Sequence, residues 1–152
     1  MLANHPYEEV AYDVYPVDLP GIKYGIGRIG QLNEPMALRN YAQFVKESLG
    51  LSGIRYSGDE NQLIHRVAVL GGAGSEWASH ALANGAEVLV TSDCDHHDVA
   101  EAWQDGLAII DATHAALEHP VLPVLCDYLR QRIPQNVTVE VCTMNDDPFH
   151  FV

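Results

Sequence analysis

From residue 64 onward, short apolar runs alternate with segments whose apolar residues recur at helical spacing. Strands are expected over 67–70, 87–91, 107–111 and 137–141, and helices over 75–84, 97–105 and 120–132. Strands that are apolar throughout and separated by helices are typical of a largely parallel sheet covered by helices on both faces. The pattern therefore predicts an α/β fold with a mostly parallel sheet.

The chain before residue 64 has a less regular pattern. Residues 9–17 alternate β-branched or aromatic residues with acids, which predicts a strand with one solvated face. Residues 23–30 are rich in glycine and read as irregular. Pro35 opens an expected helix, and Gly50 follows its last apolar residue. The segment 53–58 is expected to be a short strand or a turn.

The charge balance narrows the range of partners. Eight Lys and Arg residues stand against 21 Asp and Glu, for a formal net charge of -13. Nucleic-acid binding needs basic residues to neutralise phosphates, and anionic membranes repel acidic proteins, so we expect neither partner. Carboxylates and imidazoles do attract metal cations. With no apolar run of membrane length and no secretory signal, a cytoplasmic protein is expected, and the three cysteines, which form no CxxC pair, are expected to be free core thiols.

Three clusters of polar or glycine residues follow the predicted strands directly. They occupy residues 71–74, 92–97 and 111–118. In an α/β sheet, ligands bind at the carboxyl ends of the strands, and neighbouring strand ends lie on one rim. We therefore expect the three clusters to converge there.

His114 and Glu118 form the sharpest candidate pair. They are four residues apart, so a helix would place both side chains on one face, one turn from each other. An imidazole and a carboxylate arranged in this way can hold a divalent cation. The alternative is a histidine at a helix start beside an unrelated solvated glutamate.

His96, His97 and Asp93 belong to the acidic run that follows the second of these strands. Adjacent residues on a helix do not share a face, so the two histidines are not expected to bind one ion together. One of them could point into a site and the other into solvent. Alternatively, Asp93 or Asp95 caps the next helix and both histidines lie on the surface.

Gly71, Gly72 and Gly74 lie between a predicted strand and a predicted helix that Ser75 can cap. The segment lacks the Lys and Ser/Thr of a P-loop and is not the dinucleotide fingerprint. Its backbone N–H groups could bind an anion such as phosphate at the helix start. A tight structural turn is the alternative reason for these glycines.

Five segments in series resemble one known family. They are HPYEEVAYDVYPV, GIGRIGQL, VAVLGGAG, EVLVTSDCDHHDV and GLAIIDATH with Glu118. The chain is similar to the C-terminal half of the GTP cyclohydrolase 1 type 2 homologs, the NGG1-interacting-factor-like dinuclear metal proteins. The resemblance implies that residues 1–20 contain the last strand of a CutA/PII-like inserted domain. Residues 21–152 would then be the C-terminal lobe of a two-lobed, Nif-like α/β domain.

The resemblance also implies a cytoplasmic protein with a two-metal site, assembled as a hexameric ring. His114 and Glu118 match the family's metal ligands, and His97 matches a frequent histidine near the site. The bound ions would be zinc, iron, manganese, magnesium or nickel. The family's further ligands, an adjacent His-His pair and an Asp, belong to a first half that this sequence lacks. Ser92 and Thr113 stand where the family often has glycine.

Two functions follow as expectations. The first is a metal-dependent hydrolase that acts on a nucleotide-like small molecule through a metal-activated water. The second is a non-catalytic binding or assembly module, or a truncated half whose metal site is incomplete. An unpaired sheet edge and an apolar face left by the missing half would favour association with itself, as a homo-oligomer.

Overall fold

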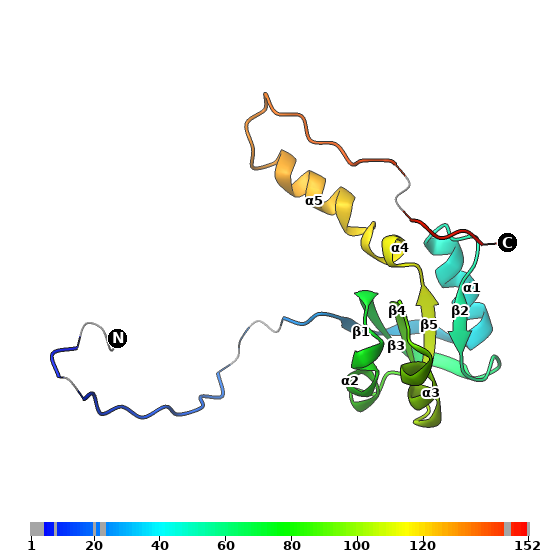
Figure 1. Cartoon of the computed structure of the whole chain (residues 1–152), viewed down its shortest axis with the longest axis horizontal. Coiled ribbons are helices and arrows are strands. Elements are labelled where there is room, and N and C mark those ends of the chain that lie inside the picture. Colours follow the sequence, from blue (N-terminus) through cyan, green and yellow to red (C-terminus); the bar gives the residue numbers. More distant parts are fainter. Residues whose placement is uncertain (1–4, 8, 20, 22–23, 145–146, 152) are drawn as a thin grey trace.

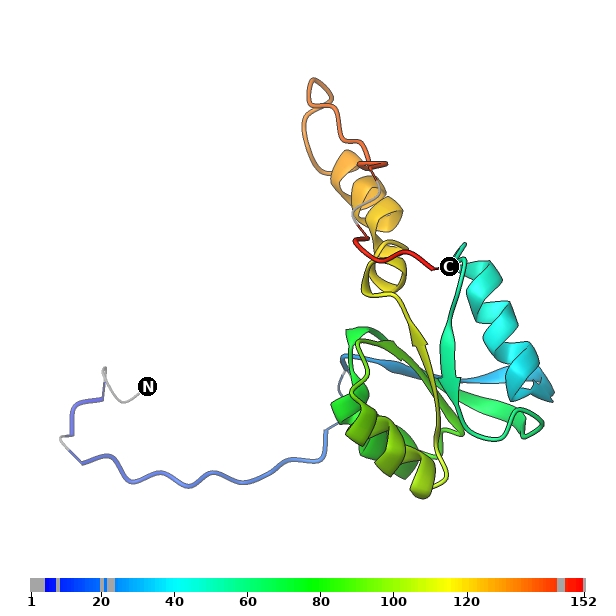
Figure 2. The same ribbon diagram turned by 45° about the vertical axis from the view of Figure 1, so that its right-hand side comes forward.

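The computed structural model describes residues 5–7, 9–19, 21, 24–144 and 147–151 (Figures 1 and 2). Its strands are β1 (Arg28–Ala37), β2 (Arg55–Ser57), β3 (Leu63–Ala73), β4 (Val88–Ser92) and β5 (Ala108–Ala112). Its helices are α1 (Leu38–Ser48), the 3-10 turn η2 (Ser75–Trp77), α2 (Ala78–Ala83), α3 (His96–Gln104), α4 (His114–Glu118) and α5 (Val121–Arg130). None of the helices in these residues is both long and apolar enough to cross a bilayer.

The strands form one sheet in the order β1-β3-β4-β5-β2. The three central strands run parallel, with Val69 opposite Val90 and Val90 opposite Ile110. The two outer strands are antiparallel to their neighbours, so the α/β class is confirmed with a parallel centre and antiparallel edges. The parallel strands end at a common rim, as the pattern of the sequence predicted.

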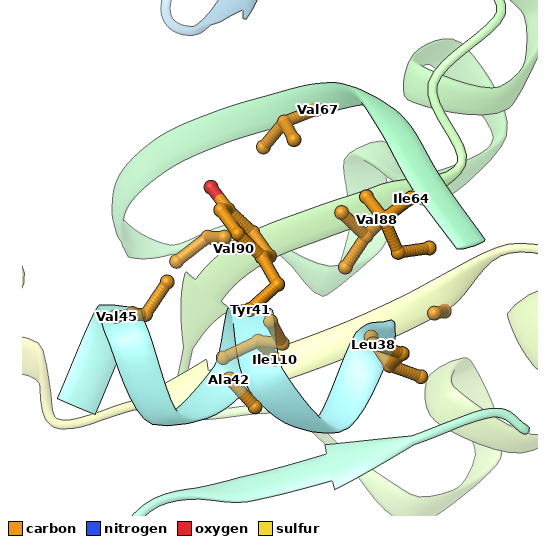
Figure 3. Packing of buried hydrophobic residues seen from close by; sticks show 10 residues of the cluster. Leu38, Tyr41, Ala42, Val45, Ile64, Val67, Val88, Val90 and Ile110 are labelled. Carbon is orange, nitrogen blue, oxygen red and sulfur yellow. The ribbon is translucent and has the colours of Figure 1, made fainter. Parts of the chain in front are cut away.

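One face of the sheet is covered by α1 (Figure 3). Leu38, Tyr41 and Val45 recur at helical spacing and pack against Val88, Val90 and other residues that point to this side of the strands. Because successive strand residues point to opposite faces, Leu89 and Ile109 lie on the other face. There they pack against α2 and α3, which Figure 2 shows on the side opposite α1. Helices on both faces are thus confirmed.

Two predicted strands are absent from the described residues. Residues 9–17 and 137–141 form no regular element, although their sequences alternate as strands do. A strand is stable only when a neighbour satisfies its backbone, and no strand of the described residues pairs with either segment. The assignment of residues 1–20 to an inserted domain stays a prediction.

The start of the sheet also differs from expectation. Residues 28–30 were expected to be irregular and residues 35–37 to be helical, but residues 28–37 form the edge strand β1, whose pairing is interrupted between Gln31 and Met36. Pro35 has no N–H to donate, and an edge strand tolerates it because one side of its backbone is unpaired. The helix therefore begins only at Leu38.

The glycine segment is not a simple turn before a helix. β3 continues through Ala73, with a register shift between Val69 and Ala73, and only then does the chain enter η2 and α2. Ser75 does not cap a helix: its hydroxyl donates to Asp98 Oδ2 at 2.6 Å. The helix expected over 75–84 is accordingly split into two short pieces.

Helix α5 extends away from the sheet (Figure 1). Only Cys126 of this helix is buried. Its apolar residues Val121, Val124, Leu125, Tyr128 and Leu129 are exposed. The chain after α5 then returns toward α1 and β2, and this tail reaches the rim that holds the site described next (Figure 1).

Candidate metal centre

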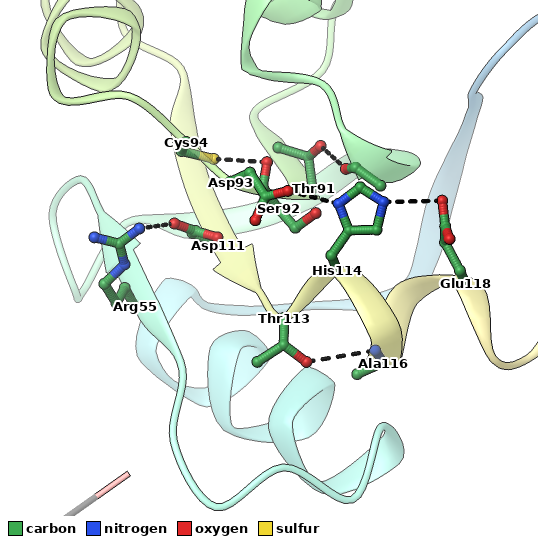
Figure 4. A network of polar contacts seen from close by, with 11 residues as sticks. Arg55, Thr91, Ser92, Asp93, Cys94, Asp111, Thr113, His114, Ala116 and Glu118 are labelled. Atoms are coloured by element: carbon green, nitrogen blue, oxygen red, sulfur yellow. Dashed lines mark hydrogen bonds and ion pairs between the residues drawn. The ribbon is translucent and has the colours of Figure 1, made fainter. Parts of the chain in front are cut away.

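The three polar clusters do converge at the carboxyl ends of β3, β4 and β5 (Figure 4). Gly72 belongs to the bulged end of β3, and Asp93 directly follows β4. His114 and Glu118 are the first and last residues of α4, which begins just after β5. Side chains that are far apart in sequence therefore meet on one rim of the sheet.

His114 lies between two carboxylates. Its Nδ1 is 2.5 Å from Asp93 Oδ2, and its Nε2 is 3.1 Å from Glu118 Oε1. The prediction that His114 and Glu118 lie together on one face of a helix is confirmed. Asp93 is close to the pair, although only its position in a neighbouring cluster suggested this.

Asp93 adopts a left-handed backbone conformation, with φ of 52°. Aspartate is one of the few residues besides glycine that visit this region. The hydrogen bond that the Asp93 carboxylate accepts from the His114 imidazole raises the pKa of that imidazole, and the negative charge of Glu118 raises it further. Two carboxylates that favour a proton on this ring create a local potential that favours any cation at the same place.

The backbone of Gly72 lies directly beside the side chains of His114 and Glu118. Its φ is 71°, and a Cβ there would lie 3.0 Å from Glu118 Oε1 and 3.2 Å from His114 Nε2. Thr91 Oγ1 donates to the Gly72 carbonyl at 2.9 Å and holds this backbone in place. At Gly71 a Cβ would meet only the Leu117 carbonyl, at 3.5 Å. Glycine at position 72 thus lets α4 approach the end of β3, whereas an anion-binding role for Gly71, Gly72 and Gly74 stays a prediction.

The side chains of His114 and Glu118 could supply part of the ligand set of one divalent cation. His114 Nε2 and Glu118 Oε1 face each other, and imidazole nitrogen with carboxylate oxygen is a common ligand combination for such ions. Among the described residues, no group of three or more His, Cys, Asp and Glu side chains is placed to hold a metal ion. The described residues therefore bring together two candidate ligands, His114 and Glu118, which are fewer than a complete metal site needs.

His96 and His97 lie exposed on α3, with ring centroids 5.6 Å apart, edge to face. His96 lines a cavity of about 240 Å³ with Cys94 and Asp111, and the role of His97 near the site stays a prediction. Asp95, not Asp93, occupies the N-cap position of α3, and its side chain makes no capping bond. The capping interpretation of Asp93 is wrong, because Asp93 binds His114 instead.

Sequence reasoning missed the ion pair between Arg55 of β2 and Asp111 of β5 (Figure 4). The two residues are 56 positions apart, and only the pairing of β2 with β5 reveals that they meet. The three cysteines are free, as predicted, but they are not all core thiols, because Cys142 is exposed and Cys94 is only partly buried. Burial raises the pKa of the Cys94 thiol to about 12. A thiol that stays protonated at neutral pH is a poor nucleophile.

Thr91 and Ser92 are adjacent buried residues at the end of β4, and substituting each in turn tests which hydroxyl stabilises the rim. Both hydroxyls are fully buried at 0% exposure, but within the described chain only that of Thr91 has a hydrogen-bond partner. We expect Thr91→Val to lower the free energy of unfolding by about 1–3 kcal/mol, because it leaves the Gly72 carbonyl unpaired. Ser92→Ala should be at least as stable as the wild type in chemical denaturation. Equal losses in both variants would contradict this assignment.

The fold and the rim site define a class: an α/β protein with a histidine–carboxylate site at the carboxyl ends of its parallel strands. Residues 2–148 match the family described as Duf34/NIF3 (NGG1p interacting factor 3), and the chain belongs to this family. It is 44% identical over 116 residues to the GTP cyclohydrolase 1 type 2 homolog of Bacillus subtilis, covering 76% of this chain and 31% of that protein.

Two further relatives agree. The Halalkalibacterium halodurans homolog of the same name is 38% identical, covering 100% of this chain and 41% of that protein. The crystal structure of a Bacillus cereus protein related to NIF3 superposes with a TM-score of 0.76 at 38% identity, covering 99% of this chain and 42% of that one. The chain thus spans well under half the length of these relatives.

Proposed function

We propose that this chain provides two ligands, His114 and Glu118, to a divalent-metal site that activates water to hydrolyse a nucleotide-like small molecule. The observation that carries the proposal is the placement of His114, with Nε2 facing Glu118 and Nδ1 held by Asp93. A metal-binding histidine characteristically uses its second ring nitrogen to bond a carboxylate, which fixes the tautomer and the ring orientation.

In this proposal each residue has a separate task. His114 and Glu118 bind the cation, Asp93 positions the imidazole, and Gly72 leaves room for the pair. A bound divalent cation lowers the pKa of a coordinated water and so supplies a nucleophile at neutral pH. Zinc, iron, manganese, magnesium and nickel are all compatible with a mixed imidazole and carboxylate set.

A second candidate is a binding or assembly module without turnover. Two observations favour it. The described residues bring together only two candidate metal ligands, and the apolar residues of α5 are exposed. Here the chain would associate with copies of itself or with a further lobe, in a ring such as a hexamer, within the cytoplasm. The two candidates differ in whether this chain retains a metal.

Elemental analysis of the purified chain tests the proposal. We expect a divalent metal in the wild-type protein and its loss in a His114→Ala, Glu118→Ala double variant. The matched control is Glu76→Ala, His80→Ala, which removes an exposed acid and histidine of the same spacing from η2 and α2 and should keep the metal. Equal metal content in all three proteins, or none in the wild type, would overturn the proposal and leave the assembly module.

A further inference from the structure

A cavity of about 310 Å³ is lined by His114 but not by Glu118, and the C-terminal tail forms one of its walls. Asp93, Asp111 and Arg55 line it from the sheet, and Phe149 and Phe151 line it from the tail. The cavity therefore combines carboxylates, one guanidinium, the imidazoles of His114 and His150, and aromatic rings.

The tail is fixed at two points. The carboxylate of Asp147 bonds the side chain of Thr113, at the start of α4, and accepts the Phe149 backbone N–H at 3.0 Å. These bonds, with that of Thr113 first, lower the pKa of Asp147. Phe151 lies directly against the backbone of Gly53, where any Cβ would collide with its ring. Position 149, between the anchors, is thus held at the cavity.

Phe149 presents an open aromatic face. Its side chain is 70% exposed although its backbone is bonded to Asp147. Exposing a large aromatic ring at a cavity leaves a surface on which a flat ring can stack. Phe151, by contrast, is partly used in its contact with Gly53.

The polar groups of the cavity favour a ligand with hydrogen-bond donors. Asp93 uses one oxygen for His114, and Asp111 uses one for Arg55. A carboxylate has about four acceptor positions in all, so both can accept further N–H groups.

We propose that this cavity binds a planar nitrogen heterocycle with N–H donors, which stacks on Phe149 and donates to the free oxygens of Asp93 and Asp111. The inference deepens the proposed function, because it names the substrate class of the same site. The ring would lie on the side of His114 that faces Asp93, whereas Nε2 of the same imidazole faces Glu118.

The test is a fluorescence titration of the full chain with 2-aminopurine, whose emission is quenched when it stacks. We expect saturable quenching, and a dissociation constant raised about tenfold or more in Phe149→Leu, which keeps the apolar bulk and loses the flat face. Phe149→Trp should bind at least as tightly as the wild type. The matched control is Phe44→Leu, an exposed phenylalanine of α1 that does not line the cavity.

Adenine and purine serve as competitors of 2-aminopurine. Purine lacks the exocyclic amine, so it should displace the probe only at a higher concentration than adenine does. Unchanged affinity in Phe149→Leu, equal displacement by purine, or no saturable quenching would each overturn the inference. Metal content is measured on the same Phe149→Leu protein and should equal that of the wild type. Ring binding without metal would refute the proposed function alone, and metal without ring binding would refute this inference alone.

Discussion

Replacing Gly72 with alanine is expected to lower the metal content of the chain to that of the His114→Ala, Glu118→Ala variant. The new Cβ would lie 3.0 Å from Glu118 Oε1 and 3.2 Å from His114 Nε2, so the two ligands would have to move apart from the backbone beneath them. The left-handed φ of 71° adds a strain of about 1–2 kcal/mol for any residue with a side chain. Elemental analysis and chemical denaturation measure the two effects.

Gly71→Ala is the matched control for this substitution. It adds the same methyl group one residue earlier, where the nearest atom is the Leu117 carbonyl at 3.5 Å, an ordinary contact distance. We expect it to keep the wild-type metal content and most of the stability. If Gly72→Ala binds as much metal as Gly71→Ala, then Gly72 does not shape the site and the pair tolerates displacement.

Ile110→Ala is expected to have the largest effect on stability. Ile110 has 0% exposure in β5 and packs in the core cluster with residues of α1, β3 and β4 (Figure 3 shows its place). Truncating a buried isoleucine to alanine costs about 2–5 kcal/mol, from lost burial and the cavity left behind. Domains of this size are stable by only about 5–15 kcal/mol, so a substantial part of the stability should disappear.

Val124→Ala in α5 provides the comparison for the core substitution. It removes two methyl groups from a side chain that is 66% exposed, so the midpoint of urea denaturation should hardly change. A loss in Val124→Ala as large as that in Ile110→Ala would mean that the exposed face of α5 is covered in solution. In that case, dilution should lower the midpoint of both proteins.

The sequence predicted the candidate site well where the chemistry is local. His114 and Glu118 are one helical turn apart, and the short helix α4 alone brings their side chains together. Asp93 was placed near them only by the rule that parallel strands end at one rim. Its direct bond to His114 depends on a left-handed backbone at Asp93, which no spacing rule indicates.

The parts of the fold that sequence missed depend on strand pairing. The apolar strands β4 and β5 and the helix α1 were predictable because their periodicity reflects burial. β1 was not, because as an edge strand it is mostly exposed and contains Pro35. Residues 9–17 show the opposite error: a strand-like alternation without a partner in the described chain forms no strand. The Arg55–Asp111 pair was hidden for the same reason, since it needs the β2–β5 register.

The two outer strands have a consequence for how copies of this chain can associate. β2 has three residues, and β1 is interrupted by an irregular pairing and by a proline, so neither presents a long, continuous row of free backbone donors and acceptors. Extension of the sheet from one molecule into the next is therefore disfavoured at both ends. The edges thus resist fibre formation, and any ordered association would be governed by side-chain surfaces such as the apolar face of α5.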